Sequence, residues 1–169
     1  SCSNFRGGDS MDAYVILTPF YPSTEKVKLA NRYRAGIERQ KNKPVAVGLV
    51  TSEAVFEEFF ADDPLYIHVG AQISVKRERQ WPEARLTKIA DAREQLRKWF
   101  IARNETYALM LDSDIEFLKP TEFEDMKHFI DTGKGLLVSN GIQYVYRKHF
   151  CYFLACSLAH RDVMEMSCF

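Results

Sequence analysis

Short, wholly apolar runs alternate with helical segments along most of this chain, and this alternation limits the fold more than any other feature. The runs lack the polar alternation of half-exposed strands and predict strands buried on both faces. Between them, apolar residues recur at spacings of three and four, as in amphipathic helices. The predicted strands are 14–18, 45–50, 65–69, 107–111 and 136–139, and the predicted helices are 24–40, 53–60, 81–103 and 123–130. Ser23 or Thr24 should cap the first helix.

The order of these segments predicts an α/β fold with a mostly parallel central sheet flanked by helices, in the manner of Rossmann-like domains. Ligands of such folds bind beyond the carboxyl ends of the strands. Two further strand-like segments, 144–147 and 151–158, follow the fifth strand and lead into a short helix. The sequence shows no repeat and no linker, so we expect one domain over residues 11–169 after a flexible leader at 1–10.

The overall charge is balanced, with 23 basic and 23 acidic side chains among 169 residues. A net charge of zero disfavours a protein held globally on nucleic acid or anionic lipid. The longest stretches without a charged residue or histidine are 13–24 and 135–146, each twelve residues long, and Phe150–Ala159 follows with ten. A membrane-spanning helix needs about 20. The first ten residues are polar and carry no secretory signal, so we expect a cytoplasmic protein without a membrane span.

The four cysteines form no metal-binding motif, since no two are separated by two residues. Cys151 and Cys156 fall on one predicted strand, where a separation of five places them on opposite faces and prevents a disulfide. We expect reduced thiols, and a disulfide that involves the terminal Cys2 and Cys168 is the alternative.

The apolar strand at 107–111 ends abruptly in Asp112-Ser113-Asp114. In extended backbone, residues i and i+2 point to the same side, so we expect both carboxylates to face one ion or one substrate. Two like charges this close repel each other unless a cation compensates, and oxygen ligands suit Mg²⁺ or Mn²⁺. A simple turn or a helix cap is the structural alternative.

Arg93 interrupts the apolar stripe of the helix that precedes this strand. The other members of the stripe are Leu86, Ile89, Leu96 and Phe100. A guanidinium that faces the core cannot lose its charge and therefore needs an anionic partner. We expect Asp112, Asp114 or a bound diphosphate to supply it, whereas a structural ion pair or a side chain that extends to solvent is the alternative.

Together these motifs resemble the centre of GT-A-fold glycosyltransferases, particularly those like family two. In that family an alanine–arginine helix segment leads into an apolar strand that ends in a DxD motif. Here Ile89–Glu94 reads IADARE and lies about nineteen residues before Leu111–Asp114, which reads LDSD. The first strand runs into Thr18-Pro19-Phe20, which is similar to the family's nucleotide-binding loop. The resemblance extends from Tyr14 to about Glu165.

The resemblance implies a metal-dependent transferase that moves a sugar from a nucleotide-diphosphate-sugar donor to an acceptor hydroxyl, with inversion at the anomeric carbon. Asp112 would contact the ribose or the metal, and Asp114 would ligate Mn²⁺ or Mg²⁺. Arg93 would face the diphosphate or brace the carboxylates. The remaining donor-binding residues would be Thr18, Pro19 and Phe20, largely through their backbone, and Ser113.

An inverting enzyme also needs a general base for the acceptor hydroxyl. The family usually supplies it as a late carboxylate, which makes Asp162 the candidate, with Glu165 second and a helix cap as the structural alternative for Asp162. His160 could be a further metal ligand. The acceptor could be a glycan, a glycoprotein or a lipid, and the chain could form a homo-oligomer. The domain is minimal, or short at its C-terminal end, compared with the family.

Two other functions compete with this interpretation. A haloacid-dehalogenase-type phosphohydrolase also places Asp-x-Asp at a strand end, but on its first strand, whereas here the motif follows the fourth. A non-catalytic nucleotide- or sugar-binding module could retain the fold without the chemistry. The loop at 76–81, which carries Lys76, Arg77, Arg79 and Trp81, could be a lid over the donor.

Overall fold

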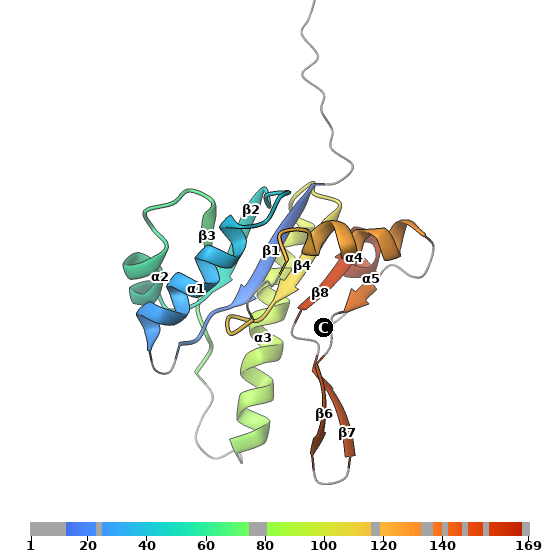
Figure 1. Cartoon of the computed structure of the whole chain (residues 1–169). Helices are drawn as coiled ribbons and strands as arrows, with labels where there is room; N and C mark the ends of the chain where they lie inside the picture. The colour runs from blue at the N-terminus through green and yellow to red at the C-terminus, as the bar shows by residue number, and fades with distance from the viewer. Residues whose placement is uncertain are drawn as a thin grey trace, which may run out of the picture.

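A six-stranded sheet with helices on both faces forms the body of the protein in the computed structural model (Figure 1). The structure describes residues 13–22, 25–74, 81–115, 119–132, 137–139, 142–146, 149–153 and 156–166. The strands are β1 (Tyr14–Pro19), β2 (Ala46–Val50), β3 (Tyr66–Gly70), β4 (Tyr107–Leu111), β5 (Leu137–Ser139), β6 (Ile142–Tyr146), β7 (His149–Phe153) and β8 (Cys156–His160). The helices are α1 (Lys26–Glu38), α2 (Glu53–Phe59), α3 (Trp81–Ile101), α4 (Glu122–Asp131) and α5 (Arg161–Met166).

The order of strands in the large sheet is β3-β2-β1-β4-β8-β5. β1 pairs in parallel with β2 and β4, and β2 pairs in parallel with β3. β8 runs antiparallel to both of its neighbours, β4 and β5. The predicted mostly parallel α/β sheet is therefore confirmed, with β8 as its one reversed strand. The carboxyl ends of β1 and β4 lie at the same edge, where the sequence places its DxD motif.

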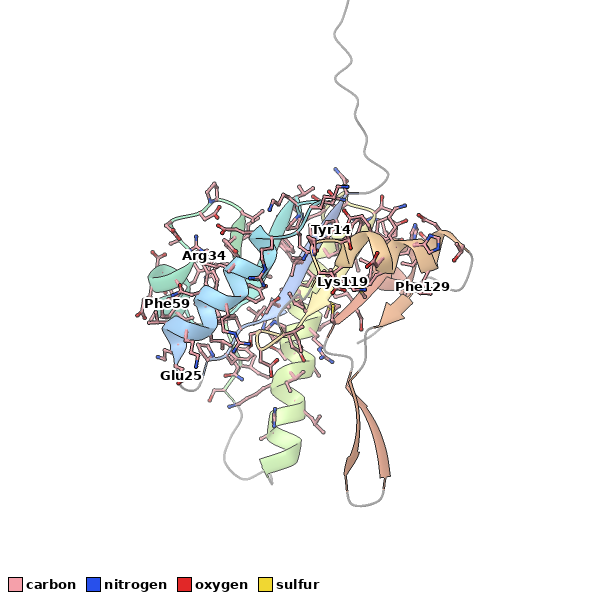
Figure 2. All side chains as sticks on the ribbon, viewed as in Figure 1. Tyr14, Glu25, Arg34, Phe59, Lys119 and Phe129 are labelled. Atoms are coloured by element: carbon pink, nitrogen blue, oxygen red, sulfur yellow. The ribbon has the colours of Figure 1, made fainter. Side chains whose placement is uncertain are left out.

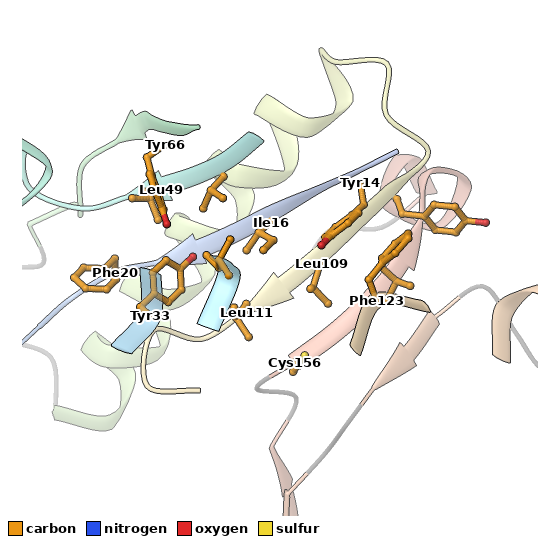
Figure 3. Packing of buried hydrophobic residues seen from close by; sticks show 14 of the residues in the cluster. Tyr14, Ile16, Phe20, Tyr33, Leu49, Tyr66, Leu109, Leu111, Phe123 and Cys156 are labelled. Atoms are coloured by element: carbon orange, nitrogen blue, oxygen red, sulfur yellow. The ribbon is translucent and has the colours of Figure 1, made fainter. Parts of the chain in front are cut away.

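Two apolar layers pack against the sheet because each buried strand offers alternate side chains to opposite faces. Ile16 and Leu109 face the layer formed with α1, α2 and α4, where Tyr14 stacks on Phe123 at a ring-centroid distance of 3.9 Å (Figure 3). The neighbouring strand residues Val15 and Leu17 face the other layer, with α3 and α5. On the first face, the Arg34 guanidinium of α1 donates to the Phe59 carbonyl of α2 at 2.6 Å (Figure 2).

Gly48 in β2 allows α3 to approach the sheet closely. A Cβ atom at this position would lie 2.6 Å from the Trp99 ring, closer than any carbon pair tolerates. The glycine therefore allows the C-terminal half of α3 to pack directly against the sheet. The N-terminal half of α3 extends beyond the carboxyl ends of the strands, on the same side as the β6–β7 hairpin (Figure 1). Leu86 is accordingly 66% exposed, so its predicted place in the buried stripe is wrong.

Two further predictions are corrected by the fold. The segment 151–158 is not one strand, because β7 pairs with β6 in a separate hairpin and β8 pairs within the large sheet. Cys151 and Cys156 therefore belong to different sheets, and Cys156 is a free, buried thiol. The first helix is preceded by Glu25, which adopts a left-handed conformation with φ of 49° and makes no side-chain capping bond. The predicted hydroxyl cap is wrong.

Arg161 joins the end of α3 to the chain that enters β4. Its guanidinium donates to the carbonyls of Glu105 at 3.0 Å and Arg103 at 2.5 Å, and to those of Ile101 and Phe100 at 3.3 Å each. The last carbonyls of a helix lack partners within the helix, and a cation there also interacts favourably with the helix dipole. Arg161 thus holds α5, α3 and β4 together at the amino edge of the parallel strands.

Several sequence predictions lie outside the described residues. They are the leader at 1–10, the polar residues of the loop before α3, and the terminal Cys2 and Cys168. Within the described ranges, no helix is both long and apolar enough to cross a lipid bilayer.

Candidate functional site

The two carboxylates of the DxD motif lie in a turn at the carboxyl end of β4. The strand ends at Leu111, and the Ile115 N–H donates to the Asp112 carbonyl at 3.1 Å. The sequence analysis predicts an extended backbone at Asp112-Ser113-Asp114. This prediction is wrong, because the segment forms a turn. The turn nevertheless keeps the carboxylates together: Asp112 is half-buried, Asp114 is exposed, and their charges interact.

Arg93 supplies the cation next to this pair. Its Nη2 atom lies 3.7 Å from Oδ1 of Asp112, so the prediction of an anionic partner for this guanidinium is confirmed. Burial raises the pKa of the Asp112 carboxyl above its ordinary value, the Arg93 charge opposes this rise, and the Asp114 charge adds to it. A second positive charge beside Asp112 and Asp114 would therefore stabilise the ionised form of both carboxylates.

A pocket of about 690 Å³ opens between this turn, α3 and the end of β1. Asp112, Ser113 and Asp114 line one side of it. The α3 side carries three cationic side chains, which are Arg85, Lys88 and Arg93. The volume lies within the usual range for small-molecule sites, which is about 300–1,000 Å³. Charged groups of both signs therefore converge on a cavity at the edge where ligands of such folds bind.

The three predicted residues of the first loop, Thr18, Pro19 and Phe20, have different surroundings in the structure. Pro19 lines the larger pocket. The Thr18 side chain is fully buried, and its hydroxyl forms a 2.6 Å hydrogen bond with the Tyr33 hydroxyl. Phe20 is also fully buried, where it packs edge-on against Phe60, although it borders a second, smaller pocket.

This second pocket, of about 360 Å³, lies at the ends of β1, β2 and β3 and shares Tyr21 and Gln72 with the larger one. It contains a residue that the sequence did not single out, Thr51, whose side chain is fully buried. The hydroxyls of Thr51 and Tyr21 are buried and have no hydrogen-bond partner within the described part of the chain. Burial, and then the charge of Asp91, raise the pKa of Tyr21 to about 12, which keeps this hydroxyl a neutral donor.

Unpartnered buried hydroxyls are costly in a folded protein, and each one calls for an explanation. Both residues line this pocket, although their hydroxyl oxygens are themselves shielded from solvent. No single sequence signal distinguishes Thr51 from a core threonine. Tyr21, which follows the Thr18-Pro19-Phe20 segment directly, could have been found by extending that loop by one residue.

The predicted general base is not at this site. β8 runs antiparallel to β4, so His160 pairs with Tyr107 at the start of β4, whereas Cys156 pairs with Leu111 at its end. Asp162 and Glu165 follow His160 and lie at the opposite edge of the sheet from Asp112. A strand of five residues is about 13 Å long, which excludes Asp162 from the reaction centre at Asp112. His160 is excluded as a metal ligand there for the same reason.

Cys156 lies beside the end of β4 but does not offer a reactive thiolate. Burial, followed by the charges of Glu122 and Asp112, raises the pKa of the thiol to about 12. Among the residues that the structure describes, no group of three or more histidine, cysteine, aspartate or glutamate side chains is arranged to hold a metal ion. Among the described residues that line the larger pocket, the carboxylates available to a metal are those of Asp112 and Asp114.

Neither a protein-family model nor a curated protein matches the sequence. The chain is similar to a CMP:2-keto-3-deoxy-manno-octonic acid synthetase solved in complex with CTP, with a TM-score of 0.56 and 12% identity over 90% of this chain and 76% of that one. This similarity shows the fold, and the predicted GT-A-like architecture is confirmed at that level.

Two further structures match less closely. S. aureus TarS, residues 1–349, gives a TM-score of 0.49 with 14% identity over 79% of this chain and 38% of that one. A glycosyltransferase involved in glycosylation of the major capsid of PBCV-1 gives 0.45 with 13% identity over 91% of this chain and 63% of that one.

Proposed function

We propose that the protein is a metal-dependent glycosyltransferase that moves a sugar from a nucleotide-diphosphate-sugar to an acceptor hydroxyl. The observation that carries this proposal is the convergence of Asp112 and Asp114 with Arg93 and Lys88 on one pocket at the carboxyl edge of the sheet. A phosphohydrolase of the haloacid-dehalogenase type is disfavoured, because its aspartate motif belongs on the first strand and this motif follows β4.

The donor set fits a hard divalent cation. Magnesium and manganese take one or two protein carboxylates and complete their coordination with water and substrate phosphate oxygens. Asp112 and Asp114 supply two such carboxylates, and the mutual repulsion of their charges would be relieved by the cation. When bound, Mg²⁺ or Mn²⁺ would stabilise the negative charge that develops on the departing nucleoside diphosphate.

The protein side chains perform the remaining tasks. Arg93 is placed to bind the diphosphate and to neutralise the leaving group as the bond to the sugar breaks. The smaller pocket accepts the nucleoside, with the Tyr21 and Thr51 hydroxyls as bonding partners. Asp112 and Asp114 are the carboxylates among the described residues that line the larger pocket. Both are assigned to the metal, so inverting transfer would take its general base from a residue outside the described lining of this pocket.

The proposal is tested by titrating the whole chain calorimetrically with UDP, GDP, ADP and CMP, each with and without Mn²⁺. We expect one nucleotide to bind in a metal-dependent manner, and the corresponding nucleotide-sugar to release that nucleotide slowly by hydrolysis. Binding without any turnover would favour the non-catalytic module. Pyrophosphate release from a nucleoside triphosphate and a sugar phosphate would instead indicate nucleotidyl transfer, and no binding of any nucleotide would refute the donor site.

Replacing Thr51 with valine should weaken nucleotide binding about tenfold and leave the free energy of unfolding unchanged or slightly higher. The hydroxyl makes no hydrogen bond within the described part of the protein, so its removal relieves an unpaired buried group but takes a partner from the ligand. Calorimetry and chemical denaturation measure the two effects. The matched control is Thr18→Val, which breaks the bond to Tyr33 and should lower stability by about 1–2 kcal/mol without changing affinity. Equal affinities of Thr51→Val and wild type would remove Thr51 from the nucleoside pocket.

A further inference from the structure

The smaller pocket carries a positive charge that no acidic side chain of its described lining offsets. Lys26, the first residue of α1, contributes the ammonium group. The amino end of a helix adds a partial positive charge, and Glu25, which precedes Lys26, makes no side-chain capping bond there. Lys26 is not part of the lining of the larger pocket, where Arg93 and Asp112 lie. Its charge therefore belongs to the pocket in which the nucleoside is proposed to bind.

The other polar side chains of this described lining are neutral. They belong to Tyr21, Thr51, Ser52 and Gln72. The Ser52 Oγ atom accepts the Val55 N–H at 3.3 Å, which leaves the hydroxyl proton to donate. A hydroxyl or an amide can donate or accept a hydrogen bond, whereas an ammonium only donates. Lys26 is thus the side chain that fixes the polarity of its partner on the ligand, which must be an acceptor.

The nucleobases differ in what they present to such a donor. Uracil and guanine carry a ring carbonyl beside a ring N–H, whereas cytosine and adenine carry an amino group at the corresponding position. A carbonyl accepts a hydrogen bond from an ammonium, but an amino group at the same place would leave two donors facing each other. A site built to bond one polar group rejects the analogue that lacks it, because the group on the protein is then left without its partner.

We propose that the smaller pocket selects a keto base, uracil or guanine, and that Lys26 donates a hydrogen bond to the base carbonyl. This inference rests on the proposed nucleoside pocket and adds the class of base to it. Arg93 lies beside Asp112 at the larger pocket and is the cation proposed for the diphosphate, so Lys26 determines specificity instead. Lys26 is exposed, which limits the expected discrimination to about tenfold.

The test compares UDP with CDP, and GDP with ADP, by calorimetry on the whole chain with Mn²⁺. The two members of each pair differ in the base alone, so the ratio of their affinities isolates recognition of the base. For the size of base that the protein accepts, the keto nucleotide should bind about tenfold more tightly.

Two variants of Lys26 and one control test the assignment of this residue. In Lys26→Met the ratio should approach one, because the donor is lost. In Lys26→Glu the ratio should reverse, because a carboxylate accepts from an amino group and repels a carbonyl. Lys28→Met alters a lysine of the same helical turn, whose ammonium lies 3.3 Å from the Glu25 carboxylate, and should preserve the ratio of wild type.

The two proposals fail differently. Metal-dependent binding with equal affinities within each pair, or with tighter binding of the amino base, would overturn the selection of a keto base and leave the donor site in place. An unchanged ratio in Lys26→Met, including a uniform loss of affinity as expected for a phosphate contact, would overturn the role of Lys26 at the base. Absence of binding by every nucleotide would overturn both proposals.

Discussion

Replacing Asp112 with asparagine should reduce nucleoside diphosphate release from the donor by about 10²–10³-fold, in a protein that remains folded. Asparagine keeps the shape of the side chain but removes the charge that would hold the metal beside Arg93. Metal-dependent binding of the nucleotide should be lost in the same variant. Calorimetry with and without Mn²⁺, and a coupled assay of the released nucleotide, measure the two losses.

The stability of this variant offers an independent check. Because the pKa of Asp112 is raised in the folded protein, the native state binds this proton more tightly than the unfolded chain does. The ionised carboxyl therefore costs stability at neutral pH, and that cost disappears as the pH falls through the raised pKa. Asp112→Asn should thus be at least as stable as wild type at pH 7, and any advantage should shrink on acidification.

The matched control for Asp112→Asn is Asp162→Asn, which neutralises a carboxylate that is 66% exposed at the opposite edge of the sheet. We expect its turnover and nucleotide affinity to equal those of wild type. A large loss of turnover in Asp162→Asn, with Asp112→Asn fully active, would contradict the site described above.

Replacing Arg161 with methionine should lower the free energy of unfolding by about 3 kcal/mol, since hydrogen bonds from a charged group contribute about 1.5–3 kcal/mol each but do not add fully. Methionine preserves much of the apolar stem but lacks the guanidinium, whose carbon lies 4.6 Å from the centroid of the Phe100 ring. The carbonyls of Ile101, Arg103 and Glu105 would lose this donor. For a chain of 169 residues the midpoint of thermal unfolding should fall by about 6–12 °C.

Lys98→Met is the control for this prediction, because Lys98 is near the end of the same helix and its side chain is 73% exposed. It should shift the unfolding midpoint by about 1–2 °C at most. Should Arg161→Met fail to fold, Arg161→Lys retains the charge and should show a smaller loss. Nucleotide affinity should stay the same in each folded variant. A midpoint of thermal unfolding for Arg161→Met within 1–2 °C of wild type would contradict the role of Arg161 in holding α5, α3 and β4 together.

The fold was largely predictable because its signals are local. Buried parallel strands are apolar throughout, so β1, β2 and β4 could be located from their composition to within a residue. The division of 151–158 between β7 and β8 could not be predicted, because nothing in an apolar run indicates where the chain leaves one sheet and enters another. The exposure of Leu86 depends on how far α3 extends past the sheet, which periodicity does not report.

Only part of the site could be predicted from sequence. Arg93 was found because it places a charge where an apolar residue would be expected, and Asp112 because it begins a pair of carboxylates at the end of an apolar strand. Thr51 was missed, because its significance arises from burial without a hydrogen bond, which is a property of the folded chain. Asp162 was misplaced because the reversed direction of β8 moves everything after that strand to the opposite edge of the sheet.

That reversed strand has a consequence for how the protein can vary. β5 ends and β8 begins at the same edge, with Ser139 next to Ser157, so the hairpin between them is a detour that leaves the sheet and returns to it. The register of the sheet does not depend on the length of such a detour. The chain can therefore exchange, lengthen or shorten this segment beside Asp112 while the residues that line the two pockets stay in place, which makes the surroundings of the site adjustable separately from the pockets themselves.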